Sequence, residues 1–178
     1  MNCDNAIMLA KSVGFTHAAV LDVASIRLQE EVRDMCASGN CGQYGKNWSC
    51  PPHQGSIDEC RRQIQSYHNG ILVQTVGNTE DCFDIESMLE TEALHKELVF
   101  ALQGLLLLHH PRLLTLGAGC CTLCKSCTCP SEPCRMPEKR ISSMEAYGML
   151  VLEVCRDNQL AYNYGPNKIA YTSCFLLD

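Results

Sequence analysis

The sequence predicts an α/β fold, with a sheet of about four strands, helices packed against it, and two cysteine-rich loops at its rim. Segments with helical spacing of apolar residues alternate with short apolar and β-branched runs, and this alternation is typical of α/β proteins. Two further segments follow neither pattern and contain most of the fourteen cysteines. The strand order stays open, and an α+β, ferredoxin-like arrangement is the alternative. A chain of 178 residues fits a single domain, residues 1–178.

Five segments are expected to form helices, because their apolar residues recur every three or four positions. Two of them begin with a capping box, Ser56-x-x-Glu59 and Ser142-x-x-Glu145, whose side chains satisfy backbone N–H groups at a helix start. Gly14 stands where the first helix is expected to end. The expected helices are residues 4–13, 25–35, 56–67, 81–109 and 142–156, and the expected strands are residues 15–21, 71–76, 113–116 and 169–177.

The densest group of cysteines lies in residues 119–134. Cys121, Cys124 and Cys127 form a Cys-x2-Cys-x2-Cys run, and Cys134 follows beside a proline. The bacterial ferredoxin ligand run has the same form, although its last gap is three residues and here it is six. Two residues between ligands let the backbone curl around a cluster, and soft, anionic thiolates suit iron. The run therefore predicts a metal site that binds a [4Fe–4S] cluster through these four cysteines.

A second cysteine-rich segment covers residues 36–53 and contains Cys36, Cys41 and Cys50. It is rich in glycine, asparagine and proline, so it is expected to be a loop. Loops of this length in compact domains are usually functional or disordered, and a metal would order this one. The three cysteines are candidate ligands of a second metal site, which needs a fourth ligand or stays open. His53 and Cys60 are the nearest candidates for the fourth position.

Five other residues are not expected to be ligands. Cysteines that stand singly in expected helices or strands are usually small buried hydrophobes, and this interpretation applies to Cys3, Cys82, Cys155 and Cys174. His95, in the longest expected helix, is interpreted as a surface or partly buried side chain.

Composition narrows the class of protein. The net charge of −6 and the lack of a basic stripe argue against nucleic-acid binding. The apolar run 105–108 is too short to cross a membrane, and residues 1–14 do not resemble a secretory signal. Disulfide-stapled secreted scaffolds are usually shorter than about 100 residues. We therefore expect a cytoplasmic protein whose thiolates are held by metal.

Four segments together resemble an uncharacterised family of cysteine-rich, predicted metal-binding proteins, domain of unknown function 2284. They are residues 44–52, 119–127, 133–137 and 143–148, and the resemblance extends from about Val32 to the last strand. It implies a soluble bacterial or archaeal protein that binds an iron–sulfur cluster. The family's cysteine positions correspond to Cys36, Cys41, Cys50, Cys121, Cys124, Cys127 and Cys134. Cys120 and Cys129 look like additions in this chain, and Cys129 competes with Cys127 for one ligand position.

Three functions fit these features. The first is an iron–sulfur protein with one or two [4Fe–4S] clusters, which transfers electrons to a redox partner protein or assists a redox or metal-centre pathway. The second is an enzyme whose three-thiolate cluster has an open iron, with Tyr44, Lys46 and His53 nearby to move protons. The third is a zinc-binding module or a metallochaperone, with carriage of metal by the Cys120–Cys121 pair. The oligomeric state stays open.

Overall fold

The computed structural model describes residues 1–39 and 41–178, and Asn40, in the cysteine-rich segment 36–53, lies outside the described residues. Its five-stranded sheet has the order β1-β2-β5-β3-β4. The strands are β1 (His17–Val20), β2 (Asn69–Asn78), β3 (Leu113–Gly117), β4 (Ser142–Ser143) and β5 (Lys168–Leu177). Neighbouring strands are antiparallel except β3 and β4, which are parallel. The four expected strands are present, and β4 is the additional one.

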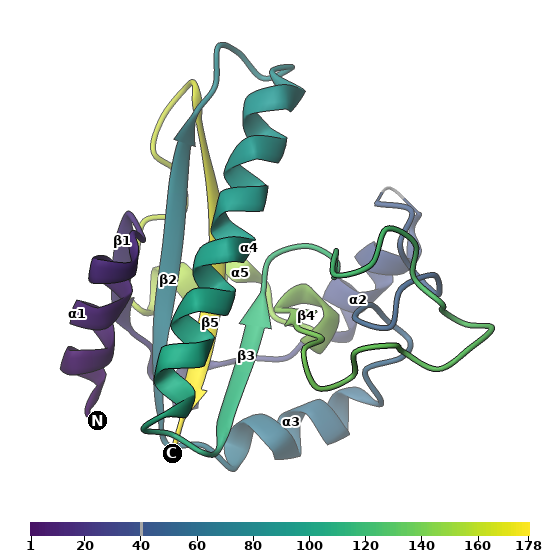
Figure 1. Cartoon of the computed structure of the whole chain (residues 1–178), viewed down its shortest axis with the longest axis horizontal. Helices are drawn as coiled ribbons and strands as arrows, with labels where there is room; N and C mark the ends of the chain where they lie inside the picture. Colours follow the sequence, from purple (N-terminus) through teal and green to yellow (C-terminus); the bar gives the residue numbers. More distant parts are fainter. Residues whose placement is uncertain (40) are drawn as a thin grey trace.

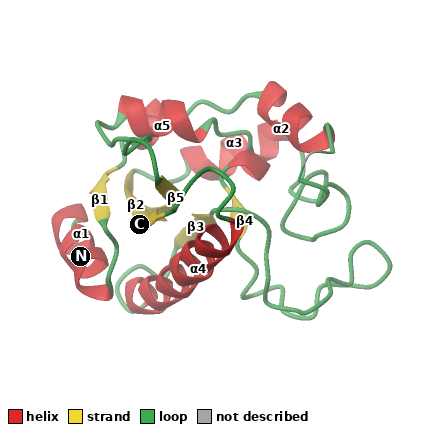
Figure 2. Ribbon diagram, turned by 90° about the horizontal axis from the view of Figure 1, so that it is seen from above, coloured by secondary structure: helices red, strands yellow, loops and turns green. Residues whose placement is uncertain are grey.

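The α/β class predicted from the sequence is confirmed, and helices cover both faces of the sheet. The helices are α1 (Cys3–Val13), α2 (Glu30–Ala37), α3 (Ile57–Gln65), α4 (Ile85–Leu107) and α5 (Val151–Asp157), with two short 3₁₀ helices, η1 (Val23–Ser25) and η2 (Glu145–Tyr147). Helices α1 and α4 lie on one face, whereas α3 and α5 lie on the other (Figures 1 and 2). Helix α2 lies beyond α3, toward the long loops at one edge of the sheet (Figure 2).

Each face of the sheet has its own hydrophobic core, because alternate residues of a strand point to opposite faces. Ile71 and Val73 of β2 pack with Phe175 of β5 against α1 and α4. Leu72 and Cys174, one residue out of phase, pack against α3 and α5. The central strands therefore present apolar residues to both faces, as strands covered on both faces usually do.

Two of the lone cysteines behave as the sequence predicts. Cys155 and Cys174 are buried in the core under α3 and α5, and burial raises the pKa of the Cys174 thiol to about 12. Cys82 differs, because it lies in an exposed turn before α4 rather than inside a helix.

The capping box at Ser56 and Glu59 is confirmed, because both of its reciprocal hydrogen bonds are present at the start of α3. The box expected at Ser142 and Glu145 is wrong. Ser142 pairs with Leu116 of β3 instead. The following helix, α5, begins only at Val151.

A backbone constraint at Gly148 explains the delayed start of α5. Gly148 has φ +88°, and a Cβ at this position would lie 2.9 Å from the carbonyl oxygen of Gln29. The chain therefore turns sharply between η2 and α5, and one continuous helix from Ser142 is not possible.

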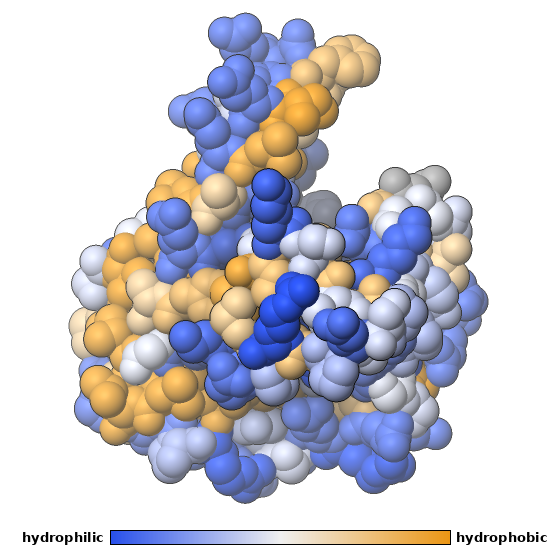
Figure 3. All heavy atoms as spheres, turned by 45° about the vertical axis from the view of Figure 1, so that its right-hand side comes forward, coloured by the Kyte–Doolittle hydropathy of each residue, from blue (hydrophilic) through white to orange (hydrophobic). Residues whose placement is uncertain are grey.

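The long helix α4 packs on the sheet only along part of its length. Its buried residues begin at Thr91. Before that point, apolar side chains such as Phe83 (82% exposed), Ile85 and Leu89 face solvent, and Figure 3 shows apolar surface on this projecting end. No helix in the described part of the chain has the length and apolar content needed to span a bilayer.

The expectation that His95 lies at or near the surface is wrong, because its side chain is fully buried between α4 and the sheet. Its Nδ1 lies 2.8 Å from Thr75 Oγ1, and its Nε2 lies 2.7 Å from Ser173 Oγ. Both ring nitrogens are therefore satisfied by hydroxyl groups. Burial lowers the pKa of His95 to about 4, because the charged imidazolium loses its hydration.

This histidine makes the stability depend on pH. The folded protein keeps His95 neutral down to about pH 4, whereas the unfolded chain takes up its proton near the ordinary pKa of 6.5. The contribution of neutral His95 to the unfolding free energy is thus complete above pH 6.5, and it is lost as the pH falls toward 4. His95→Gln should be less stable than the parent at pH 7, and the difference in unfolding free energy should shrink by about 2 kcal/mol at pH 5. Denaturant unfolding of both proteins at pH 7 and pH 5 measures this difference in unfolding free energy. A difference that does not change with pH would contradict the role of His95.

Candidate metal centre

Two long loops meet at the β4 edge of the sheet (Figure 1). The first cysteine loop (residues 38–56) connects α2 to α3, and the second cysteine loop (residues 118–141) connects β3 to β4. Because β3 and β4 are paired, the second loop leaves and re-enters the sheet at neighbouring positions. Met144 N also donates a hydrogen bond to Gly117 O over 3.0 Å. The expected placement of both cysteine loops at the rim agrees with this arrangement.

Buried side chains of the first cysteine loop hold the backbone of Cys121 in the second. Asn47 Nδ2 donates to Cys121 O over 2.9 Å, and Cys121 N donates to Ser49 Oγ over 2.8 Å. Ser49 Oγ in turn donates to Asn47 Oδ1 over 2.9 Å. Asn47 and Ser49 are 5% and 0% exposed, so these bonds are shielded from water. We call this set of three hydrogen bonds the Asn47–Ser49 clamp.

Further contacts join the two loops around the clamp. Trp48 Nε1 donates to Glu132 O over 3.1 Å, and the Cys129 thiol lies 3.5 Å from the carbonyl oxygen of Gly45, to which it donates. Gln54 connects the first loop to β4, because its Oε1 accepts from Ser142 Oγ over 2.6 Å. These hydrogen bonds join the two cysteine loops into one structural unit.

The four cysteines expected to bind a cluster lie around one hollow, which we call the C-terminal hollow. It has a volume of about 20 Å³. Its cysteines are Cys121, Cys124, Cys127 and Cys134, and its other lining residues include Asn47, Trp48, Met136, Arg135 and Arg140. Cys127, and not Cys129, lines this hollow, since the Cys129 thiol is directed at Gly45.

A second and larger hollow, which we call the N-terminal hollow, has a volume of about 260 Å³. It is lined by the three cysteines expected at a second site and by a fourth, and these four are Cys36, Cys41, Cys50 and Cys120. Cys36 belongs to the last turn of α2, and Cys120 belongs to the second cysteine loop. Tyr44 and Glu145 also line the hollow.

The two residues proposed from the sequence as a fourth ligand lie elsewhere. The ring of His53 packs against Trp48, with centroids 4.6 Å apart. Cys60 is buried in the core under α3, and its thiol donates to Gln54 O over 3.4 Å.

Sequence reasoning missed two residues of the N-terminal hollow. Cys120 was interpreted as an addition to the run, and Glu145 as a helix cap. The adjacent pair Cys120 and Cys121 could have indicated two separate sites, because adjacent side chains of an extended chain point in opposite directions.

Four of the thiols around the two hollows are poorly solvated. Burial raises the pKa of Cys50 to about 11, and it also raises the pKa of Cys36, Cys120 and Cys121. Glu145 increases this effect at Cys36 through charge repulsion. Thiolates in such surroundings need a nearby cation to compensate their charge, and a bound metal supplies it.

The donor chemistry fits a thiolate-bound metal, although no single-ion site is preformed among the described residues. All fourteen cysteines are free thiols. Among residues 1–39 and 41–178, no three His, Cys, Asp or Glu side chains are grouped closely enough to hold one metal ion.

The fold and the two groups of thiols define a cysteine-rich α/β protein. The chain belongs to the family of predicted metal-binding proteins called DUF2284, whose model matches residues 19–177. Comparison with curated proteins and with solved structures gives no match. The resemblance noted from the sequence is therefore confirmed, and the match begins earlier in the chain than Val32.

Removal of the clamp hydroxyl should weaken metal binding as well as stability. Ser49→Ala leaves the partly buried Cys121 N–H without its acceptor and should cost about 1–3 kcal/mol of unfolding free energy. Ser56→Ala is the matched control, because loss of this helix cap costs about 1 kcal/mol and Ser56 lines neither hollow. Unfolding curves and metal content after anaerobic dialysis measure both effects. We expect metal loss only in Ser49→Ala, and equal retention in the two variants would contradict the clamp's role.

Proposed function

We propose that this protein binds a [4Fe–4S] cluster through Cys121, Cys124, Cys127 and Cys134 and serves in electron transfer, or in an accessory step of a redox or metal-centre pathway. The observation that carries the proposal is the gathering of these four thiols around the C-terminal hollow. They come from a run spaced for a cubane. Thiolate donors without histidine or carboxylate among them favour iron–sulfur binding over harder metals.

The described donor side chains form no preformed single-ion site. A zinc ion needs four donors about 2.3 Å from one point, and no three described donor side chains are grouped in that way. In a cubane each thiolate binds a different iron, so the sulfurs stand farther apart. The C-terminal hollow has room for roughly one water, so uptake of a cluster requires the surrounding loop to widen. Residues 118–141 contain no helix or strand that would resist this.

A zinc-binding module is the second candidate, and the small size of the C-terminal hollow favours it. A single ion would need the sulfurs to move together rather than the loop to open. Zinc would stabilise the junction of the two loops without redox chemistry.

A bound cluster would supply one-electron chemistry, and the chain's own residues would set its surroundings. Arg135 and Arg140 line the C-terminal hollow, and their positive charges would offset the negative charge of thiolate-bound iron. Arg135 Nη1 donates to Ser126 O over 3.0 Å, which ties the residue after Cys134 to the middle of the run. Trp48 and Met136 cover the hollow with apolar surface and limit access of water.

The proposal includes a redox partner protein and a cytoplasmic location. Both hollows lie at the rim of the sheet, where a second protein can approach them. Cysteines held by a bound metal rather than in disulfides fit a reducing compartment.

A pair of cysteine variants tests the ligand assignment. Cys124→Ser should remove the visible chromophore of the C-terminal site and about four irons with their sulfide. Cys129→Ser is the matched control, because its thiol contacts Gly45 O and not the hollow, and it should keep both. Iron, sulfide and zinc content and the visible spectrum are measured on protein purified without oxygen. A full chromophore in Cys124→Ser, or stoichiometric zinc in a colourless parent protein, would overturn the proposal.

A further inference from the structure

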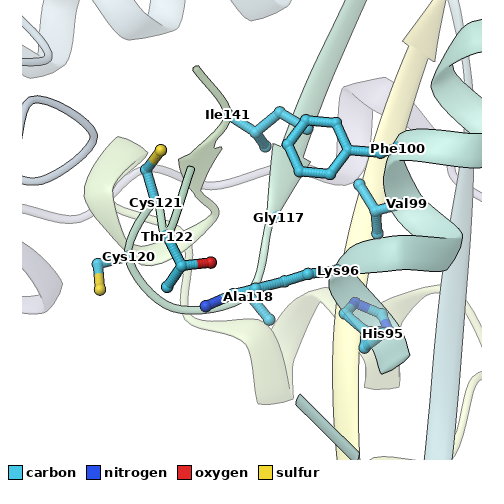
Figure 4. A pocket seen from close by; sticks show the side chains of 10 residues that line it. All are labelled: His95, Lys96, Val99, Phe100, Gly117, Ala118, Cys120, Cys121, Thr122 and Ile141. Atoms are coloured by element: carbon cyan, nitrogen blue, oxygen red, sulfur yellow. The ribbon is translucent and has the colours of Figure 1, made fainter. Parts of the chain in front are cut away.

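Adjacent cysteines of the second loop belong to different hollows. Cys121 lines the C-terminal hollow with the other cysteines of the run. Cys120 lines the N-terminal hollow with Cys36, Cys41 and Cys50. Figure 4 shows the sulfur atoms of Cys120 and Cys121 directed away from each other. Two adjacent residues therefore supply one thiol to each of the two hollows.

We propose that Cys120 is the fourth ligand of a second iron–sulfur cluster, held with Cys36, Cys41 and Cys50, and that the peptide bond between Cys120 and Cys121 joins the two clusters. This inference rests on the proposed function for the C-terminal four cysteines. It assigns Cys120, which looks like an addition to the run in the sequence, to a separate site formed mainly by the first cysteine loop.

The size of the N-terminal hollow supports a multi-atom group. Its volume of about 260 Å³ is many times the roughly 10–15 Å³ that one water-sized guest requires. A bare ion would leave most of this space to solvent. Four thiols contributed by α2 and both loops match the four-cysteine ligation of cubane clusters.

The backbone fixes the direction of both thiols. Gly119 has φ +66°, and a Cβ there would lie 2.9 Å from Glu92 Oε1 on α4. The chain therefore passes close to α4 and turns just before Cys120, a path that favours glycine. On the other side, the Asn47–Ser49 clamp holds both backbone polar groups of Cys121. Turn and clamp together leave Cys120 facing one hollow and Cys121 facing the other.

Two consequences follow for the chemistry. A site closed by four thiolates has no open iron, so electron transfer fits it better than substrate activation. Neighbouring Cα atoms are only about 3.8 Å apart, so the two clusters would be in close electronic contact. Each would accept one electron from an external reductant, and the two reduced clusters would interact magnetically.

The test counts iron and sulfide in protein purified without oxygen and records electron paramagnetic resonance spectra after reduction with dithionite. The parent protein should contain about eight irons and show spin–spin splitting between two reduced clusters. Cys120→Ser and Cys50→Ser should each lose about half of the iron and all of the splitting, and should keep the C-terminal cluster. Cys129→Ser is the matched control and should match the parent.

A second variant guards against simple misfolding. Cys120→His retains a side chain that binds iron, and histidine ligation raises the potential of a cluster. It should keep about eight irons while the midpoint potential of one cluster rises.

Unchanged potentials in Cys120→His, or full iron content in Cys120→Ser, would overturn the assignment of Cys120. About four irons in the parent, lost in Cys124→Ser but kept in Cys50→Ser, would refute the second cluster and leave the proposed function intact. A parent protein without iron would refute both.

Discussion

The cysteine-rich rim depends on the Asn47–Ser49 clamp. A buried asparagine and a buried serine in one loop take up both backbone polar groups of Cys121 in the other. Unpaired buried polar groups are costly, so the loops are stable only when they are together. Asn47 also lines the C-terminal hollow, and Ser49 precedes Cys50, which lines the N-terminal hollow. One set of hydrogen bonds therefore positions thiols on both sides.

Local patterns predicted most of the elements, and they grouped the four cysteines that line the C-terminal hollow. The apolar and β-branched residues from Ile71 to Val76 identified a strand, and the capping box at Ser56 identified the start of α3. The spacing of Cys121, Cys124 and Cys127 was sufficient to group them, because ligands separated by two residues cannot lie far apart. Such features require only information from neighbouring residues, which the sequence contains directly.

The features that the sequence did not predict depend on contacts between distant segments. Ser142 has the local signature of a helix cap, but pairing with β3 draws it into the sheet, and tertiary contacts override local propensity. Cys120 looks redundant within its run, and only the meeting of two loops some 74 positions apart places it beside Cys36 and Cys50. His95 lies on an ordinary helical pattern, which gives no sign of its hydroxyl partners on β2 and β5.

The central claim is that thiols at the junction of the two loops bind iron as sulfide-bridged clusters. Iron K-edge X-ray absorption on protein purified without oxygen tests it most directly, because it reports the atoms around each iron. Sulfide-bridged clusters should give a first shell of sulfur only and a second shell of neighbouring iron. A first shell of oxygen or nitrogen without an iron neighbour, or a preparation that contains zinc instead of iron, would contradict it.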